Sequence, residues 1–92
     1  MEIEITKQAQ KSLIKAPKHI QGKFDAWVES ILEDGLTETR KNPGFHDELL
    51  EGERKGQRSV RLNNQWRIFY TETQKGIQIM ILEVTPHDYR RK

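Results

Sequence analysis

The chain of 92 residues has no cysteine, which excludes disulfide bonds, thiolate metal sites and a cysteine nucleophile. It also has no apolar run near the roughly 18 residues that a membrane span requires. The first residues, MEIEITK, alternate between apolar and polar types, whereas a signal peptide would begin with an apolar core. We therefore expect a cytoplasmic protein that makes no contact with a membrane.

Hydrophobic residues are scarce as well, at 34% of the chain against 33% charged residues. A chain of this length buries about 60–65% of its extended surface on folding, so the core will be thin. Two Trp and three Phe are nevertheless available to bury, which argues against a disordered chain. We expect one globular domain that spans residues 1–92.

Positive charge is concentrated in the second half of the chain. Residues 1–53 hold 7 Lys/Arg against 11 Asp/Glu, a balance of −4, and residues 54–92 hold 9 against 3, a balance of +6. A basic half is typical of a protein with a polyanionic partner, although a solubilising surface would give the same numbers.

The first third of the sequence predicts a short strand and then two helices. Ile3 and Ile5 alternate with glutamates, as in a strand with one covered face. Thr6 is suited to cap a helix that ends at about Ala16, and Pro17 is suited to begin the next helix in its first turn.

The second helix is the clearest element of the sequence. Gly35 is placed to end it in a left-handed conformation. Its apolar residues recur at helical spacing and predict one buried stripe that belongs to the core: Ile20, Phe24, Trp27, Val28, Ile31 and Leu32.

The remainder predicts strands. Residues 36–47 are irregular, with space for one helical turn, and residues 48–50 suit a very short strand before a charged loop at 51–56. Further strands are expected at 58–62, 66–73 and 76–84. This order predicts an α+β fold, with two N-terminal helices packed on one face of a small, mostly antiparallel sheet.

The stretch QRSVRLNNQWRIFYTET, residues 57–73, predicts a hairpin whose register decides its two faces. A two-residue loop would mix apolar and polar residues on both faces. A loop of residues 63–65 pairs Arg61 with Arg67 and gives one coherent apolar face. That face carries Val60, Leu62, Trp66, Ile68 and Tyr70, and the other carries Ser59, Arg61, Arg67 and Phe69.

Two arginines directly opposite each other repel and destabilise a sheet by some tenths of a kcal/mol. One interpretation is that Glu72 or Glu83 neutralises them. The other is that a ligand supplies the negative charge, because guanidinium groups donate parallel hydrogen bonds to a phosphodiester.

Further basic and aromatic residues could join the arginine pair. His87 follows the last predicted strand, and histidine is the side chain best able to move protons near pH 7. The others lie in the charged loop and in the C-terminal tail: Arg54, Lys55, Arg58, Tyr89, Arg90 and Arg91. A metal site of His46, Asp47, His87 and Asp88 has no recognised ligand spacing, so we expect no metal and no cofactor.

Two segments resemble the RelE/ParE superfamily of toxins from type II toxin–antitoxin modules, particularly its mRNA-cleaving RelE, YoeB and HigB-like members. The first is LLEGERKGQRSVRLNNQWRIFY, which has the family's leucine, basic glycine loop and hairpin arginines. The second is EVTPHDYRR, similar to tails with a catalytic His or Tyr. The resemblance covers nearly the whole chain in element order.

The resemblance implies roles for residues on the hairpin. Arg67 corresponds to the arginine that acts on the scissile phosphate, and Arg61 and Lys55 match basic positions that hold the RNA backbone. Glu48 lies where YoeB-like members keep a general-base carboxylate.

The resemblance also implies that the tail takes part in catalysis, through His87 and Tyr89. This tail differs from the YoeB pattern by one extra residue before His87 and by three basic residues after Tyr89. Glu48 or His87 would be the base and His87 or Tyr89 the acid, while Phe69 or Tyr89 could stack on an unpaired base.

The resemblance therefore predicts a metal-independent endoribonuclease that cleaves mRNA, in association with the ribosome, and that a cognate antitoxin silences. Two alternatives stay open from the sequence. One is a toxin like the ParE branch, which inhibits DNA gyrase without cutting RNA. The other is a non-catalytic RNA-binding module, which would bind RNA in a salt-dependent way without products.

Overall fold

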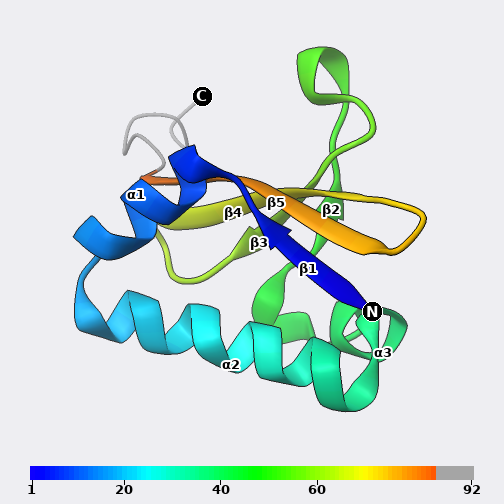
Figure 1. Ribbon diagram of the computed structural model, residues 1–92, viewed down its shortest axis with the longest axis horizontal. Helices are drawn as coiled ribbons and strands as arrows, with labels where there is room; N and C mark the ends of the chain where they lie inside the picture. Colours follow the sequence, from blue (N-terminus) through cyan, green and yellow to red (C-terminus); the bar gives the residue numbers. More distant parts are fainter. Residues whose placement is uncertain (85–92) are drawn as a thin grey trace.

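The computed structural model describes residues 1–84, and only the backbone of residues 81, 83 and 84 (Figure 1). Within this range a single sheet has the strand order β1-β5-β4-β3-β2. The tail residues that the sequence singled out, His87, Tyr89, Arg90 and Arg91, lie outside the described residues. The strands are β1 (Glu2–Ile5), β2 (Glu48–Leu49), β3 (Arg58–Arg61), β4 (Trp66–Glu72) and β5 (Gly76–Val84).

The predicted α+β fold is confirmed, and the sheet is mixed. Strands β2 to β5 pair in antiparallel fashion, whereas β1 runs parallel to β5. The parallel pair approaches closely at Gly76, where a Cβ atom would come within 1.9 Å of the Glu2 carbonyl oxygen. Any other residue there would push the two strands apart.

The described helices are α1 (Lys7–Lys15), α2 (Lys18–Asp34) and the short α3 (Leu36–Arg40). Thr6 caps α1 as predicted, since its Oγ1 accepts a hydrogen bond from the Ala9 N–H at 3.2 Å. The same hydroxyl donates to the Met80 carbonyl at 2.6 Å, which ties the start of α1 to β5. Pro17 is the N-cap residue of α2, so it lies one position before the first turn in which it was predicted.

The end of α2 differs from the prediction of a left-handed cap. Gly35 has φ 90° and ψ 160°, a region that side chains exclude and that glycine adopts. Its N–H still closes the last turn on the Ile31 carbonyl at 2.9 Å, and its own carbonyl accepts from the Thr39 N–H in α3. The positive φ thus redirects the chain straight into α3.

The core lies between α2 and one face of the sheet. In Figure 1, α2 runs below the sheet. Trp27 of α2 packs on Tyr70 of β4, with ring centroids 5.3 Å apart. The predicted stripe is wrong for Leu32, which is 61% exposed while Ile31 is buried. Because one residue turns a helix by about 100°, Leu32 points past the sheet.

The predicted hairpin register is confirmed. Arg61 lies opposite Arg67 and Val60 opposite Ile68. The turn at 63–65 is closed by the Asn63 side chain, whose Oδ1 accepts hydrogen bonds from the N–H groups of Gln65 (2.8 Å) and Trp66 (2.7 Å).

No helix of the described part is long and apolar enough to cross a membrane.

Candidate nucleic-acid interface

The second face of the sheet, opposite the helices, carries two rows of paired residues that we call the open face. One row is Glu48, Ser59 and Phe69, and the next contains Arg61 and Arg67. Directly opposite residues in neighbouring strands share a face, so Glu48, Arg61 and Arg67 come together on one surface.

The arginine pair occupies the middle of this face. The Arg67 Nη1 donates a hydrogen bond to the Ser59 hydroxyl at 3.2 Å. Arg61 has no hydrogen-bond or ion-pair partner among residues 1–84, although its Nε is buried. Glu83 is opposite Arg67 in the backbone register, and its side chain is not among those described. The pair therefore places two guanidinium side chains next to each other in the middle of the open face.

Glu48 is the carboxylate of the open face. It pairs with Ser59, which makes it a diagonal neighbour of Arg61 at roughly 7–8 Å, a distance that long side chains span. Glu48 is exposed to solvent. A carboxylate and two guanidinium groups can thus contact the same ligand.

The charged loop covers Phe69, where the sequence suggested a surface for base stacking. Its 3-10 turn η2 (Gly52–Arg54) places the Arg54 guanidinium 4.1 Å from the centre of the Phe69 ring. Arg54 also donates to the Gln57 side chain at 3.1 Å, and Phe69 is only 8% exposed. A nucleotide base could reach Phe69 only if Arg54 moved, whereas Lys55 is exposed beside it.

Arg58 points to the opposite face of the sheet from the arginine pair. It lies opposite Tyr70, and its Nε donates to the Asp47 carboxylate at 2.5 Å. The strand alternation explains the placement, because Arg58 and Val60 face the helices while Ser59 and Arg61 face away. The alternation was visible in the sequence, and it separates Arg58 from the other candidate RNA-binding residues.

Sequence reasoning missed the polar network around Asp47, whose side chain is 1% exposed. Its Oδ2 accepts a hydrogen bond from the Tyr70 hydroxyl at 2.6 Å and lies 3.8 Å from Arg40 Nε. Burial, together with the hydrogen bond to Asp47, raises the pKa of Tyr70 well above its ordinary value. Glu72, a candidate partner for the arginine pair, instead contacts Arg40 at 3.4 Å.

Metal-ligating side chains do not gather in the described part of the chain. Residues 1–84 contain no group of three or more His, Cys, Asp or Glu side chains that could hold a metal ion. His46 and Asp47 are neighbours in sequence, but the Asp47 carboxylate is already engaged by Arg58 and Tyr70.

Comparison with known families identifies the class of protein. The family described as the ParE toxin of the type II toxin–antitoxin system parDE matches residues 3–89. The match covers most of the chain, so the chain belongs to this family of the RelE/ParE superfamily. The protein is therefore a toxin of a type II toxin–antitoxin system. A sequence comparison with curated proteins finds no match.

Solved structures share the fold at low sequence identity. YoeB in the YoeB–YefM complex from Staphylococcus aureus superposes with a TM-score of 0.73 and 21% identity over 94% of this chain and 98% of that chain. YafQ from E. coli superposes with a TM-score of 0.74 and 20% identity over 90% of this chain and 91% of that chain. The YoeB/ParE toxin from Agrobacterium tumefaciens superposes with a TM-score of 0.71 and 14% identity over 94% of this chain and 100% of that chain.

Proposed function

We propose that this toxin is a metal-independent endoribonuclease that cleaves mRNA at the ribosome and so inhibits translation. The observation that carries the proposal is the open face, where Glu48, Arg61 and Arg67 share one surface. Arg58, on the helix-facing side of the sheet, has a carboxylate partner, but Arg61 has none among the described residues. A phosphodiester would supply the missing negative charge.

The chemistry needs a base, an acid and a clamp for the phosphate. The base, Glu48 or His87, takes the proton of the 2′-hydroxyl, whose oxygen attacks the adjacent phosphorus. Arg67, with Arg61 or Lys55, stabilises the charge on the pentacoordinate phosphate. The acid, His87 or Tyr89, protonates the 5′-oxygen as its bond to phosphorus breaks, which leaves a 2′,3′-cyclic phosphate.

We further propose that a cognate antitoxin covers the open face. Support comes from the family, whose members belong to toxin–antitoxin systems, and from similar folds solved as the YoeB–YefM and DinJ–YafQ complexes. An acidic segment laid over Arg61 and Arg67 would relieve their mutual repulsion, and its binding would weaken with salt.

A second candidate is a ParE-like toxin that inhibits DNA gyrase. The name of the matching family favours it. Its activity would require a protein contact in place of a phosphate site, and would not depend on a carboxylate facing two arginines. The open face therefore favours the ribonuclease.

The test is pulse induction of the toxin in growing bacteria, followed by mapping of new 5′ ends on abundant mRNAs. Wild type is compared with Arg67→Ala and His87→Ala, and Lys75→Ala serves as an exposed-cation control from the distant β4–β5 turn. Cuts within translated regions that either site variant abolishes are expected. Growth arrest without cuts, together with loss of gyrase supercoiling, would overturn the proposal in favour of the second candidate.

A further inference from the structure

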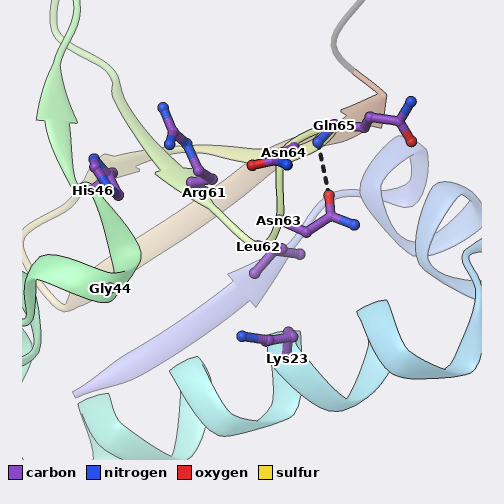
Figure 2. A pocket seen from close by; sticks show the side chains of 8 residues that line it. All are labelled: Lys23, Gly44, His46, Arg61, Leu62, Asn63, Asn64 and Gln65. Atoms are coloured by element: carbon purple, nitrogen blue, oxygen red, sulfur yellow. Dashed lines mark hydrogen bonds between the residues drawn. The ribbon is translucent and has the colours of Figure 1, made fainter.

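A polar groove of about 530 Å³ opens beside the arginine pair, at the edge of the sheet beyond the start of β2 (Figure 2). Lys23 of α2 forms one side of it. The other side comes from Arg61 at the end of β3 and from His46, which follows the 3-10 turn η1 (Pro43–Phe45). A smaller cavity of about 210 Å³ extends the groove past Phe45. The residues of α2, η1 and the β3–β4 turn thus meet only in the folded chain.

The lining of the groove is positive. Lys23 and Arg61 contribute two cations, and none of the lining residues is acidic. Within residues 1–84 neither side chain has a hydrogen-bond or ion-pair partner, and the Arg61 Nε is buried. Two unpaired cations that line one groove favour an anionic ligand, because each keeps its hydrogen-bond donors available.

His46 is held at the mouth of the groove by an uncommon backbone conformation. Its φ of 47° makes it the one non-glycine residue with positive φ in the described chain. The turn is closed by a hydrogen bond from the His46 N–H to the Pro43 carbonyl at 3.3 Å. Such strain persists only where the surroundings impose it, and it often accompanies a functional site.

The hairpin turn supplies amide groups to the same groove. The Asn63 Oδ1 accepts hydrogen bonds from the N–H groups of Gln65 and Trp66, which leaves the Asn63 NH₂ as a donor. Figure 2 shows the bond between Asn63 and Gln65, with the Asn64 side chain beside it. Asn64 is exposed to solvent. Amides of this kind hydrogen-bond to the edges of unstacked bases in single-stranded RNA.

We propose that this groove binds a nucleotide of single-stranded RNA that flanks the cleaved bond. Lys23 and Arg61 bind phosphates of its backbone, and Asn64 contacts its base. Arg61 belongs both to the open face and to the groove, so the two sites form one continuous path for an RNA backbone. The proposal rests on the proposed ribonuclease function and extends it to a residue of α2, Lys23, and to the hairpin turn.

The test measures the binding of fluorescein-labelled 2′-O-methyl hexanucleotides A6, C6 and U6 by anisotropy, across a range of salt. The 2′-O-methyl group blocks cleavage, so the anisotropy measures binding independently of cleavage. Lys23→Ala is compared with Lys18→Ala, which removes the same charge from an exposed position on the same helix, outside the groove.

For Lys23→Ala we expect the slope of log affinity against log salt to become shallower by about 0.7, as for the loss of one phosphate contact on a single strand. This corresponds to about 2.6-fold less affinity lost between 50 and 200 mM salt. Lys18→Ala is expected to keep the wild-type slope. Asn64→Ala is expected to reduce the differences among A6, C6 and U6 at an unchanged slope.

Equal slopes for Lys23→Ala and Lys18→Ala would overturn the inference. Stronger competition by hexaglutamate than by any hexanucleotide would also overturn it, and would assign the groove to an acidic peptide. Cleavage assays on unmodified mRNA bound to ribosomes separate the two proposals, because the proposed cleavage takes place at the ribosome. A wild type that cuts RNA while the slopes are equal would refute the groove alone. A wild type with a Lys23-dependent slope that cuts nothing would refute the ribonuclease alone.

Discussion

The two faces of the sheet use the same residue type in opposite ways. On the helix-facing side, Arg58 donates to Asp47, a carboxylate that is 1% exposed. On the open face, Arg61 and Arg67 lie opposite each other. Arg58 and Arg61 are three residues apart in one strand, yet only Arg58 ends in an ion pair with a buried partner.

The difference teaches which arginines the fold itself requires. A carboxylate taken out of water must be paired and hydrogen-bonded, so Asp47 depends on Arg58 and Tyr70 to remain buried. Adjacent like charges on the open face cost stability, and the proposed phosphate ligand would offset that cost. The predictions test the two sides of this contrast.

The largest expected effect is on catalysis. Arg67→Ala should lose about 3–4 kcal/mol of transition-state stabilisation, by analogy with the removal of one oxyanion donor. Its free energy of unfolding should change by less than about 1 kcal/mol, because relief of the repulsion offsets the lost bond to Ser59. Single-turnover cleavage and urea unfolding measure the two quantities. Cleavage at the wild-type rate would remove Arg67 from the mechanism.

The next effect is on stability, on the other face. Asp47→Ala should lower the free energy of unfolding by about 2–3 kcal/mol, less than for a fully buried pair because Arg40 and Arg58 keep some exposure to water. Urea denaturation measures it. Glu48→Ala is the matched control, since Glu48 is the adjacent carboxylate on the open face. Its free energy of unfolding should stay within about 0.5 kcal/mol of wild type, and a similar loss in both variants would contradict the contrast.

A smaller effect concerns the Tyr70 hydroxyl. Tyr70→Phe should lower the free energy of unfolding by about 1–2 kcal/mol near pH 7, because Asp47 and Arg40 each lose a hydrogen bond. The comparison is made by urea denaturation at matched pH.

The same residue predicts a pH dependence. The pKa of Tyr70 is raised in the folded protein, so the unfolded chain loses this proton first, at about pH 10. The contribution of Tyr70 to the free energy of unfolding is complete below pH 10 and falls by about 1.4 kcal/mol per pH unit above pH 10. The difference between wild type and Tyr70→Phe should therefore shrink from pH 9 to pH 11. A constant difference would refute the shift.

The smallest effect lies in the charged loop. Arg54→Ala should lower the free energy of unfolding by about 0.5–1 kcal/mol, the contribution of a partly exposed cation stacked on an aromatic ring, here Phe69. Lys55→Ala, its exposed neighbour, should change it by less than about 0.5 kcal/mol. If the two variants unfold at the same urea concentration, the stack contributes nothing measurable.

Much of the candidate site could be predicted from the sequence because it depends on local periodicity. The two-residue period of the strands put Arg61 and Arg67 on one face, and the apolar pattern fixed the turn at 63–65. The same period would have excluded Arg58 from that face. The roles proposed for His87 and Tyr89 stay predictions, since both lie outside the described residues.

By itself the sequence determined the helix cap at Thr6, the order of the elements and the hairpin register, because each follows from residues that are close neighbours in the chain. Only the tertiary structure decided that β1 runs parallel to β5, that Asp47 is buried with Tyr70, and that Lys23 and Arg61 line one groove. These contacts join residues 23 to 74 positions apart. They depend on how the chain folds back on the sheet, which a local sequence pattern does not determine.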